Sequence, residues 1–458
     1  MPDPLELKRE EVRALELVLD AAKTYLNELD DAPVLASRER RFGGPLPEEG
    51  GGVASALAEL IASSAVATRS SGPRFFHFVT GGTTPAALGA DWLTSLLDQN
   101  AFSAVSSPLG VEVEEVAIRW LRELFELPES WGGVLTTGAT MANFVGLAAG
   151  RRWWAQQHGV DVDERGLAGL PAMPIFSTDA IHVSARKALA MLGLGRETAR
   201  LVDVEALERG LAEAGPAIVI GNLGEVNDGR IDDLARMADL VERRGAWLHV
   251  DGAFGLFARL TPRTAALTEG VERADSVISD GHKWLNVPYD SGFAFVRDRE
   301  LLKEPFRLTA AYLPSDETPS PEASRRARAL AVWATLAAYG RSGYRAMVER
   351  HLDLAQHLGR RVEEEPDLEL LAPVTLNIAC FRYRPSGLDE EELDELNARL
   401  GEDVLADGRV FFGTTRYGGR VAFRPAIVNW RTTERDVDLI VDVLLELAER
   451  RTARQATA

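Results

Sequence analysis

The sequence predicts an α/β protein with a largely parallel central sheet, followed by a smaller α+β domain. The first reason is the alternation of short apolar segments, polar breaks and helical segments between about residues 130 and 300, which is typical of parallel sheets. The second is the change beyond Arg341, where one long helix precedes several short strands and helices. The third is size, because 458 residues with 46% hydrophobic content allow one large domain and one or two smaller ones.

Five strands are expected in the large domain, each followed by a polar or glycine-containing break. They are residues 133–137, 174–179, 217–220, 246–250 and 276–279. Ligands of open α/β sheets bind beyond the carboxyl ends of the strands, so functional residues are expected in the breaks.

The two ends of the chain have a different organisation from the large domain. Residues 5–30 and 53–67 have the periodicity of amphipathic helices, separated by a loop at 38–52, and predict a docking appendage. The C-terminal pattern is a helix at 344–364, strands at 375–383, 410–412 and 420–423, and helices at 388–400 and 434–450. The predicted domains are therefore 1–70, 71–345 and 346–458.

Composition excludes several classes of function. The net charge of −19 opposes nonspecific binding to nucleic acid or to anionic membranes. The single cysteine, Cys380, excludes an internal disulfide and a cysteine-based zinc site, and no metal site is expected. No apolar run is long enough to cross a bilayer, and the acidic N-terminal segment is unlike a signal peptide, so a cytoplasmic protein is expected.

The stretch Asp275 to Tyr289 carries the most informative lysine. Lys283 follows a short apolar strand and the break Asp280-Gly281, and stands between a histidine and a tryptophan. The chain has five lysines against 46 arginines, which indicates that Lys283 is kept for the chemistry of its amine. An amine forms a Schiff base with an aldehyde, whereas a guanidinium does not. A lysine that caps a strand end is the structural alternative.

Other polar residues follow the preceding strands. Gly138-Ala139-Thr140 begins a helix, so its backbone N–H groups could hold a phosphate. His182 begins the next helix, and Asp251 ends a strand and precedes Ala253. Each of these alone is also compatible with a structural role. Together they supply an anion cup, a ring that can stack, a carboxylate that keeps a ring nitrogen protonated, and an imine-forming amine, as pyridoxal phosphate requires.

Four segments resemble the group II pyridoxal-phosphate-dependent amino-acid decarboxylases, a family that includes the aromatic-amino-acid and glutamate decarboxylases. They are 281–290 (GHKWLNVPYD), 249–253 (HVDGA), 74–78 (RFFHF) and 423–429 (FRPAIVN), and the resemblance extends over about residues 70–450. It implies a fold type I enzyme with helices on both faces of the sheet. It also implies a homodimer with sites at the subunit interface and a small-molecule amino-acid substrate.

The resemblance assigns roles by position. Lys283 is implied to form the Schiff base, Asp251 to contact the pyridine nitrogen, and His182 to stack on the ring. The other implied cofactor contacts are Ala139, Thr140, Asn227, Ala253 and His282, and the implied substrate contacts are His77, Arg424 and Tyr312. A packed loop histidine at position 77 and a surface arginine on a strand at position 424 remain structural alternatives.

Two departures from the family pattern bear on the reaction. Glu225 and Val226 stand where many members have threonines, which puts the ring-edge contact there in doubt. Residues 313–332 contain no Tyr, Phe, Trp or His, although family decarboxylases carry in this region a mobile loop whose tyrosine is thought to reprotonate the substrate carbanion.

Three functions follow as alternatives. The first is decarboxylation of an L-amino acid to an amine and CO2 through a Schiff base with Lys283 and a quinonoid intermediate. The second is oxygen-dependent conversion to an aldehyde, favoured by the missing tyrosine. The third is a non-catalytic protein that binds pyridoxal phosphate, against which the intact Lys283, Asp251 and His182 weigh.

Overall fold

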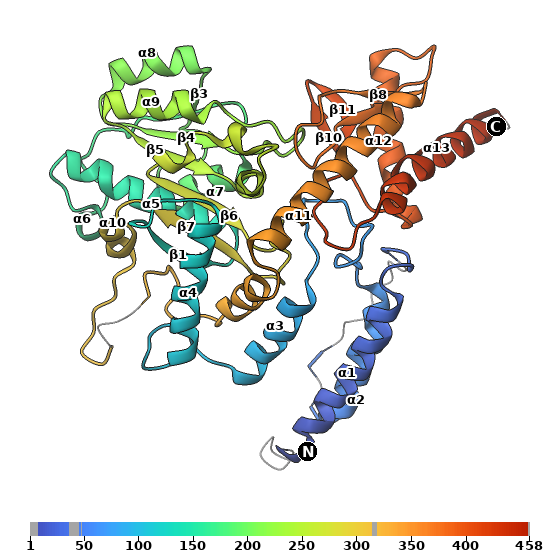
Figure 1. The fold of residues 1–458 in the computed structure, drawn as a ribbon, viewed down its shortest axis with the longest axis horizontal. Helices are drawn as coiled ribbons and strands as arrows, with labels where there is room; N and C mark the ends of the chain where they lie inside the picture. The colour runs from blue at the N-terminus through green and yellow to red at the C-terminus, as the bar shows by residue number, and fades with distance from the viewer. Residues whose placement is uncertain (1–7, 36–44, 47, 314–317, 457–458) are drawn as a thin grey trace.

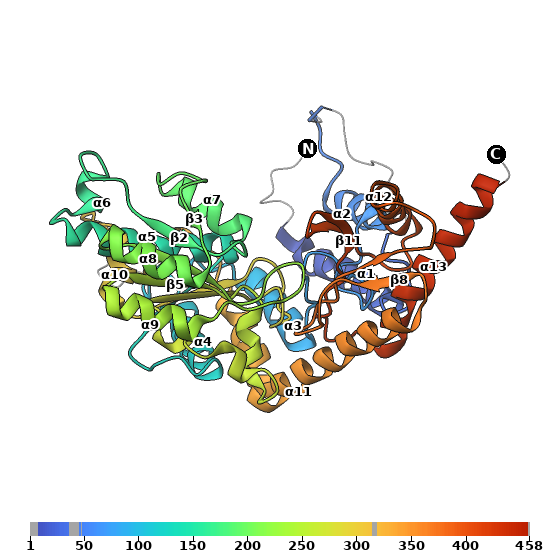
Figure 2. The same ribbon diagram turned by 90° about the horizontal axis from the view of Figure 1, so that it is seen from above.

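The computed structural model describes residues 8–35, 45–46, 48–313 and 318–456 (Figure 1). A large α/β domain and a smaller α+β domain lie side by side, and helix α11 runs from one to the other (Figures 1 and 2). Within the described ranges, no helix is both long enough and apolar enough to cross a membrane.

The large domain is built on a seven-stranded sheet of order β1-β7-β6-β5-β4-β2-β3. Its strands are β1 Gly132–Thr136, β2 Ile175–Ser177, β3 Arg200–Leu201, β4 Ile218–Asn222, β5 Trp247–Asp251, β6 Ser276–Asp280 and β7 Gly292–Val296. Strands β2 to β6 are parallel, whereas β7 runs antiparallel to both β6 and β1. The mostly parallel sheet and its five predicted strands are confirmed. Strands β3 and β7 were not predicted, since β3 has two residues and β7 is buried on both faces without alternation.

Helices cover both faces of this sheet, as expected. On one face lie α4 Pro108–Leu124, α8 Val204–Ala214 and α9 Leu234–Arg244; on the other lie α5 Ala139–Gln157, α7 Val183–Met191 and α10 Arg299–Lys303. Neighbouring residues of one strand point into different cores, so Val219 joins the first and Ile218 the second. The shorter elements are α6 Val162–Arg165, η3 Gly255–Leu260, η4 Ala265–Thr268, η5 Val271–Arg273 and η6 Glu304–Phe306.

The small domain has an antiparallel sheet of order β10-β11-β9-β8. Its elements are β8 Leu368–Leu370, β9 Phe381–Tyr383, α12 Glu390–Asp407, β10 Thr414–Tyr417, β11 Arg420–Phe423 and α13 Glu434–Ala456. The strand expected at 375–383 is reduced to β9, because residues 377–379 run beside 425–427, where Pro425 has no N–H for a ladder. The strand expected at 410–412 is wrong: Phe411 makes a single bridge to Phe75.

The N-terminal helices α1 Glu11–Glu28 and α2 Val53–Ser63 lie near the expected positions and contact each other; η2 Ser64–Val66 follows. Part of the expected loop at 38–52 lies outside the described residues. Helix α3 Pro85–Leu97 was not predicted. Figure 1 shows α1 and α2 extending away from the large sheet.

Helix α11 spans Ala329–Glu364, so its predicted start at residue 344 was too late. The two parts of α11 meet at Gly340, whose φ of 60° and ψ of −174° are not helical. Gly340 adopts this conformation at little steric cost because it has no Cβ. The first part packs against α3 and α4, and the second reaches α13 of the small domain.

One buried amide ties three distant segments together beside Lys283. Asn286 Oδ1 accepts from the backbone N–H groups of Gly82 at 2.9 Å and Trp430 at 3.0 Å. Its Nδ2 donates to the carbonyl oxygens of Trp284 and Val428, both at 2.9 Å. These bonds use both donors and both acceptor positions of the amide, and Asn286 also has a φ of 57°, a left-handed conformation that asparagine tolerates.

We expect Asn286→Ala to lower the free energy of unfolding by about 3 kcal/mol or more, because it leaves buried backbone groups unpaired and places alanine at positive φ. Urea denaturation of the purified protein measures this. Asn286→Gly should recover about 1 kcal/mol of the loss by relieving the backbone cost, and exposed Asn27→Ala should change little. A loss below about 1 kcal/mol for Asn286→Ala would contradict the role of this amide.

Candidate active site

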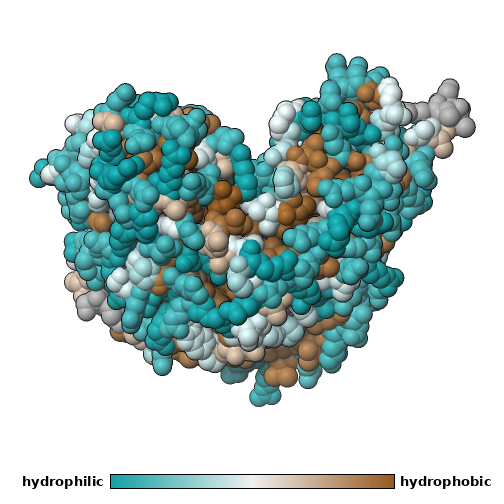
Figure 3. Space-filling view, turned by 45° about the horizontal axis from the view of Figure 1, so that its top comes forward, coloured by the Kyte–Doolittle hydropathy of each residue, from teal (hydrophilic) through white to brown (hydrophobic). Residues whose placement is uncertain are grey.

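The candidate site lies where β5 and β6 end beside the start of α5. Asp251 is the last residue of β5 and Asp280 the last of β6, and Ala139 is the first residue of α5. The molecule is hollowed between its two lobes, and hydrophobic residues gather along this hollow (Figure 3).

Lys283 lies in the loop after β6 with its side chain mostly covered. Its Nζ is 3.1 Å from Asp280 Oδ2 and 5.8 Å from the centre of the Phe254 ring. The segment before α3 packs directly on the lysine backbone, since Gly81 N donates to His282 O at 3.0 Å. A Cβ at Gly81 would lie 1.9 Å from Lys283 O, so this close approach requires glycine.

Asp280 connects Lys283 to the start of α5, and the sequence analysis missed this role. Its Oδ1 accepts from Ala139 N at 2.5 Å and lies 3.6 Å from His282 Nε2. A carboxylate at the N-terminus of a helix is stabilised by the helix dipole. The sequence contained a signal in the strand-end carboxylate of Asp-Gly-His-Lys, but Asp280 was interpreted as a strand break.

His282 and the start of α5 have the features that a phosphate requires. The ring of His282 stacks on Tyr289 with centroids 4.3 Å apart, and its Nδ1 is buried without a hydrogen-bond partner among the described residues. Burial lowers the pKa of His282. A Cβ at Gly138 would lie 3.2 Å from His282 Cε1, so glycine there lets the helix start approach the ring. These observations fit a bound phosphate group at the first turn of α5, where Ala139 N already donates to Asp280 and the following N–H groups begin at Thr140.

Asp251 and His182 are brought together through Asn143. Asp251 Oδ2 accepts from Asn143 Nδ2 at 2.9 Å, and its Oδ1 accepts from Ala253 N at 3.2 Å. The same Asn143 Nδ2 donates to Ser184 Oγ at 3.2 Å, and Ser184 Oγ lies 2.7 Å from His182 Nδ1. Burial lowers the pKa of His182, and the charge of Asp251 opposes that effect. Asn143 and Ser184 were also missed by the sequence analysis.

His77 and Arg424 form a second group of residues at this side of the molecule. Burial, assisted by the charge of Arg424, lowers the pKa of His77 to about 4. His77 packs on Phe78, with ring centroids 3.7 Å apart. Arg424 Nη1 is buried without a hydrogen-bond partner among the described residues, and burial lowers the pKa of this guanidinium. Arg424 is therefore a partly enclosed cation, which suits a carboxylate ligand.

Two other predicted site residues, Asn227 and Tyr312, have different surroundings: the Asn227 amide is paired with other side chains, and Tyr312 is exposed to solvent. Asn227 Nδ2 donates to Glu225 Oε1 at 2.8 Å, and its Oδ1 accepts from Thr415 Oγ1 at 2.7 Å, so both ends of its amide are used within the protein. Burial raises the pKa of Glu225. Tyr312 is 86% exposed, and residues 314–317 of the segment that follows lie outside the described residues.

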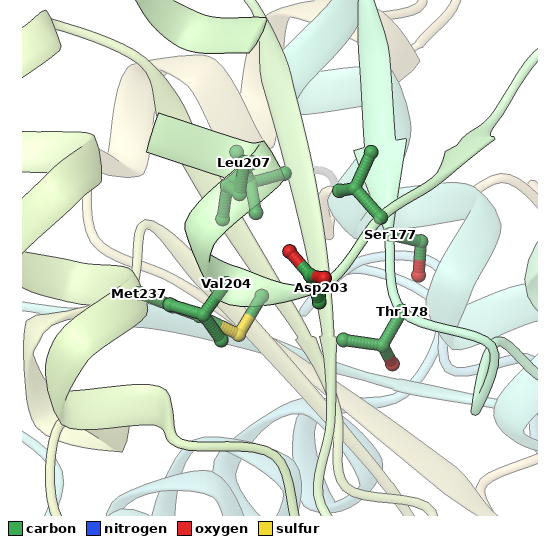
Figure 4. Close-up of a pocket in the computed structure, with 8 residues that line it drawn as sticks. Ser177, Thr178, Asp203, Val204, Leu207 and Met237 are labelled. Atoms are coloured by element: carbon green, nitrogen blue, oxygen red, sulfur yellow. The ribbon is translucent and has the colours of Figure 1, made fainter. Parts of the chain in front are cut away.

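A separate crevice lies beside the edge of the sheet (Figure 4). Its lining includes Ser177 and Thr178 at the end of β2 and Asp203, Val204 and Leu207 at the start of α8, with Met237 from α9. None of the sequence-predicted site residues lines it.

Comparisons with known proteins identify the family of the chain. A family model described as the pyridoxal-dependent decarboxylase conserved domain matches residues 53–384. An aromatic-L-amino-acid decarboxylase of Bacillus atrophaeus is 28% identical, over 98% of each chain. A phenylacetaldehyde synthase of Arabidopsis thaliana is 25% identical, over 92% of each chain.

The fold also matches solved structures. A crystal structure of Oryza sativa TDC with PLP and tryptamine superposes with a TM-score of 0.89 at 24% identity, over 97% of this chain and 98% of that chain. This likeness identifies the large domain as fold type I. The family match covers well over half of the sequence, so the chain belongs to the pyridoxal-dependent decarboxylase family, as an amino-acid decarboxylase whose cofactor is pyridoxal phosphate.

Proposed function

We propose that this protein converts an L-amino acid to the corresponding amine and CO2, with Lys283, Asp251 and His182 as its central residues. The observation that carries the proposal is the meeting of the Lys283 amine, the Asp251 carboxylate and the His182 imidazole around the start of α5. The cofactor, when bound, supplies an aldehyde for the substrate amine and a ring that accepts the electrons released with CO2.

Each residue of the site would have a distinct role when the cofactor is bound. The Lys283 amine would hold the cofactor through its aldehyde. Asp251, fixed by Asn143 and Ala253, would favour the protonated form of the ring nitrogen. Ala139, Thr140 and His282 would hold the phosphate, although Ala139 N already donates to Asp280, and His182 would stack on the ring. Asn227 remains among the proposed cofactor contacts, although its amide is already paired.

The substrate carboxylate is assigned to Arg424, whose buried guanidinium has an unpaired N–H. After CO2 leaves, Cα must receive a proton. His77 is a weak source at neutral pH, because its pKa of about 4 leaves the ring neutral. Tyr312 and His182 are the other proposed donors.

A second candidate function is oxygen-dependent formation of an aldehyde. Residues 313–332 contain no aromatic side chain or histidine, and two relatives are named phenylacetaldehyde synthases, from Arabidopsis thaliana and Petunia hybrida. In that reaction the amino acid, O2 and water give the aldehyde, CO2, ammonia and hydrogen peroxide. Slow protonation of Cα would favour it, since oxygen then has time to react.

One assay separates the candidates. The holoenzyme is incubated with a panel of aromatic, acidic and basic L-amino acids, and CO2, amine, aldehyde and hydrogen peroxide are measured together. Amine in equal amount to CO2, without oxygen consumption, supports the simple decarboxylase. Aldehyde and peroxide in equal amount to CO2 support the second candidate. Lys283→Ala is the control, and CO2 release from that variant at the native rate would overturn both.

The proposed electrostatic role of Asp251 predicts a specific loss. We expect Asp251→Asn to lower kcat by on the order of 10²–10³, because the neutral amide no longer favours the protonated ring, with a small effect on cofactor binding. Steady-state kinetics and equilibrium dialysis measure the two quantities. Asp275→Asn is the matched control, since Asp275 is a half-buried carboxylate at the other end of β6, bonded to Leu248 N. Near-normal turnover in Asp251→Asn would make its carboxylate structural.

We also propose that the enzyme is a homodimer. Helix α1 buries none of its residues in the chain, and apolar side chains such as Leu15 and Leu19 are exposed on it. Helix α3 likewise exposes Leu93 and Leu96. Apolar faces of this kind are typical of an obligate interface, which commonly buries 2,000 Å² or more. The cytoplasmic location expected from the sequence stays a prediction.

Deleting residues 1–66 should therefore give aggregated or inactive protein, because the apolar faces lose their cover. Leu15→Asp should weaken the dimer while leaving helix α1 in place. Thr24→Asp on the same helix is its control, since Thr24 is exposed and polar. Analytical ultracentrifugation measures the mass of each variant. A soluble and fully active monomer from the deletion would refute the homodimer.

A further inference from the structure

We infer that a directed chain of hydrogen bonds holds His182 as a neutral imidazole with its proton on Nε2, and that Asn143 and Ser184 are the positioning residues that impose this form. The significance of the inference for catalysis rests on the proposed function. The protonation state itself follows from contacts within the chain.

The direction of the hydrogen-bond chain is fixed at Asp251. An ionised carboxylate only accepts hydrogen bonds, so the Asn143 atom that lies 2.9 Å from Asp251 Oδ2 must be the amide nitrogen. The other end of the Asn143 amide is then its oxygen, which lies 2.8 Å from His249 Nε2. His249 must therefore donate from Nε2.

The other end of the hydrogen-bond chain is compatible with this direction. His249 is neutral, since burial lowers its pKa to about 4, and its proton is on Nε2 as Asn143 requires. Its Nδ1 therefore accepts from the Ser276 hydroxyl, 2.8 Å away. The indole of Trp247 is a donor only, and its Nε1 donates to Ser276 Oγ at 3.1 Å, which leaves the hydroxyl proton for His249.

The second N–H of Asn143 extends the hydrogen-bond chain to His182 through Ser184. It donates to Ser184 Oγ at 3.2 Å, so the single hydroxyl proton of Ser184 is free to donate to His182 Nδ1 at 2.7 Å. The backbone N–H of Ser184 donates to the same Nδ1 at 3.2 Å, with His182 as the N-cap of α7. Because a backbone N–H can only donate, Nδ1 accepts from it and carries no proton, and the Ser184 hydroxyl then donates to the same nitrogen. The neutral ring must carry its proton on Nε2.

The charged groups around His182 do not favour the imidazolium strongly. Burial is the largest effect and lowers the pKa of His182; Asp251 and Asp280 raise it, whereas Lys283 and Arg424 lower it. The two donors at Nδ1 stabilise the neutral ring in addition, because they bind the lone pair that protonation would consume. His182 can therefore donate a hydrogen bond from Nε2 near neutral pH and cannot accept one at that nitrogen.

The test uses the cofactor-free protein, so its result does not depend on turnover. The chain has seven histidines, and ¹⁵N NMR of [¹⁵N]histidine-labelled protein distinguishes protonated from unprotonated ring nitrogens. The His182 signals are assigned by their loss in His182→Gln. We expect an unprotonated Nδ1 and a protonated Nε2 between pH 6 and pH 8. A protonated Nδ1 at His182 in the native protein would overturn the inference whatever the variants do.

Ser184→Ala tests the positioning role. Removing the hydroxyl donor should raise the pKa of His182 by about one unit, and signal from the Nδ1–H tautomer should appear. Ser184→Thr keeps a hydroxyl and should restore the native signals. Ser177→Ala is the matched control, because Ser177 is a buried serine whose Oγ donates to Ile220 O outside this chain of bonds. Unchanged His182 signals in Ser184→Ala would show that Ser184 does not set the protonation state. An enzyme that forms no amine but shows the expected signals would refute the proposed function and leave this inference standing.

Discussion

The site depends on how two buried carboxylates are satisfied at the ends of neighbouring parallel strands. Asp251 and Asp280 are 3% and 2% exposed, and burial of a charge without partners is strongly unfavourable. Both are bonded by the first turns of α5: Ala139 N binds Asp280, and Asn143 Nδ2 binds Asp251. Residues 139 and 143 are four apart and share one face of the helix. One helix face therefore fixes the position of α5 against β5 and β6 together.

The same arrangement places the chemical groups. Asp280 accepts from the start of α5 and pairs with Lys283, so the amine is held beside the helix N-terminus. Asp251 orients Asn143, and Asn143 orients Ser184, which binds His182. The loop that carries Lys283 is held from the other side by the C-terminal domain. Trp284 Nε1 donates to His351 Nδ1 at 2.8 Å, and His351 Nε2 lies 3.0 Å from Asn429 O. The loop that carries the lysine is thus bonded to both domains through Trp284 and Asn286.

The sequence allowed the sheet, the strand ends and the residues with distinctive chemistry to be predicted, because these depend on local patterns. Lys283, Asp251 and His182 stand directly after strands or at helix starts, and the alternation of elements places strand ends at one edge. Asn143 carries no such local signal, since its partners Asp251 and Ser184 are 108 and 41 residues away along the chain. Ser184 bonds His182 only two residues away, but it acts in the site through Asn143. An asparagine near the start of an alanine-rich helix was a weak clue, because asparagine is a poor helix former without a specific bond. Strand β7 was missed for a similar reason: it completes the sheet between β6 and β1 only through tertiary pairing.

Amine formation and aldehyde formation share the step that releases CO2, so the product is decided after that step. The decision lies with the group that protonates Cα and with the access of oxygen to the same atom. Tyr312 is exposed in this chain, and His77 is neutral near pH 7. A ring held with its proton on Nε2, as inferred for His182, is a weak acid whose donation would leave an imidazolate unless another proton reached the chain through Ser184. Fast protonation therefore requires either a proton supplied to His182 through Ser184 or another acid, such as Tyr312 or a group from a second copy of the chain. If the acid comes from a second copy, the product depends on assembly.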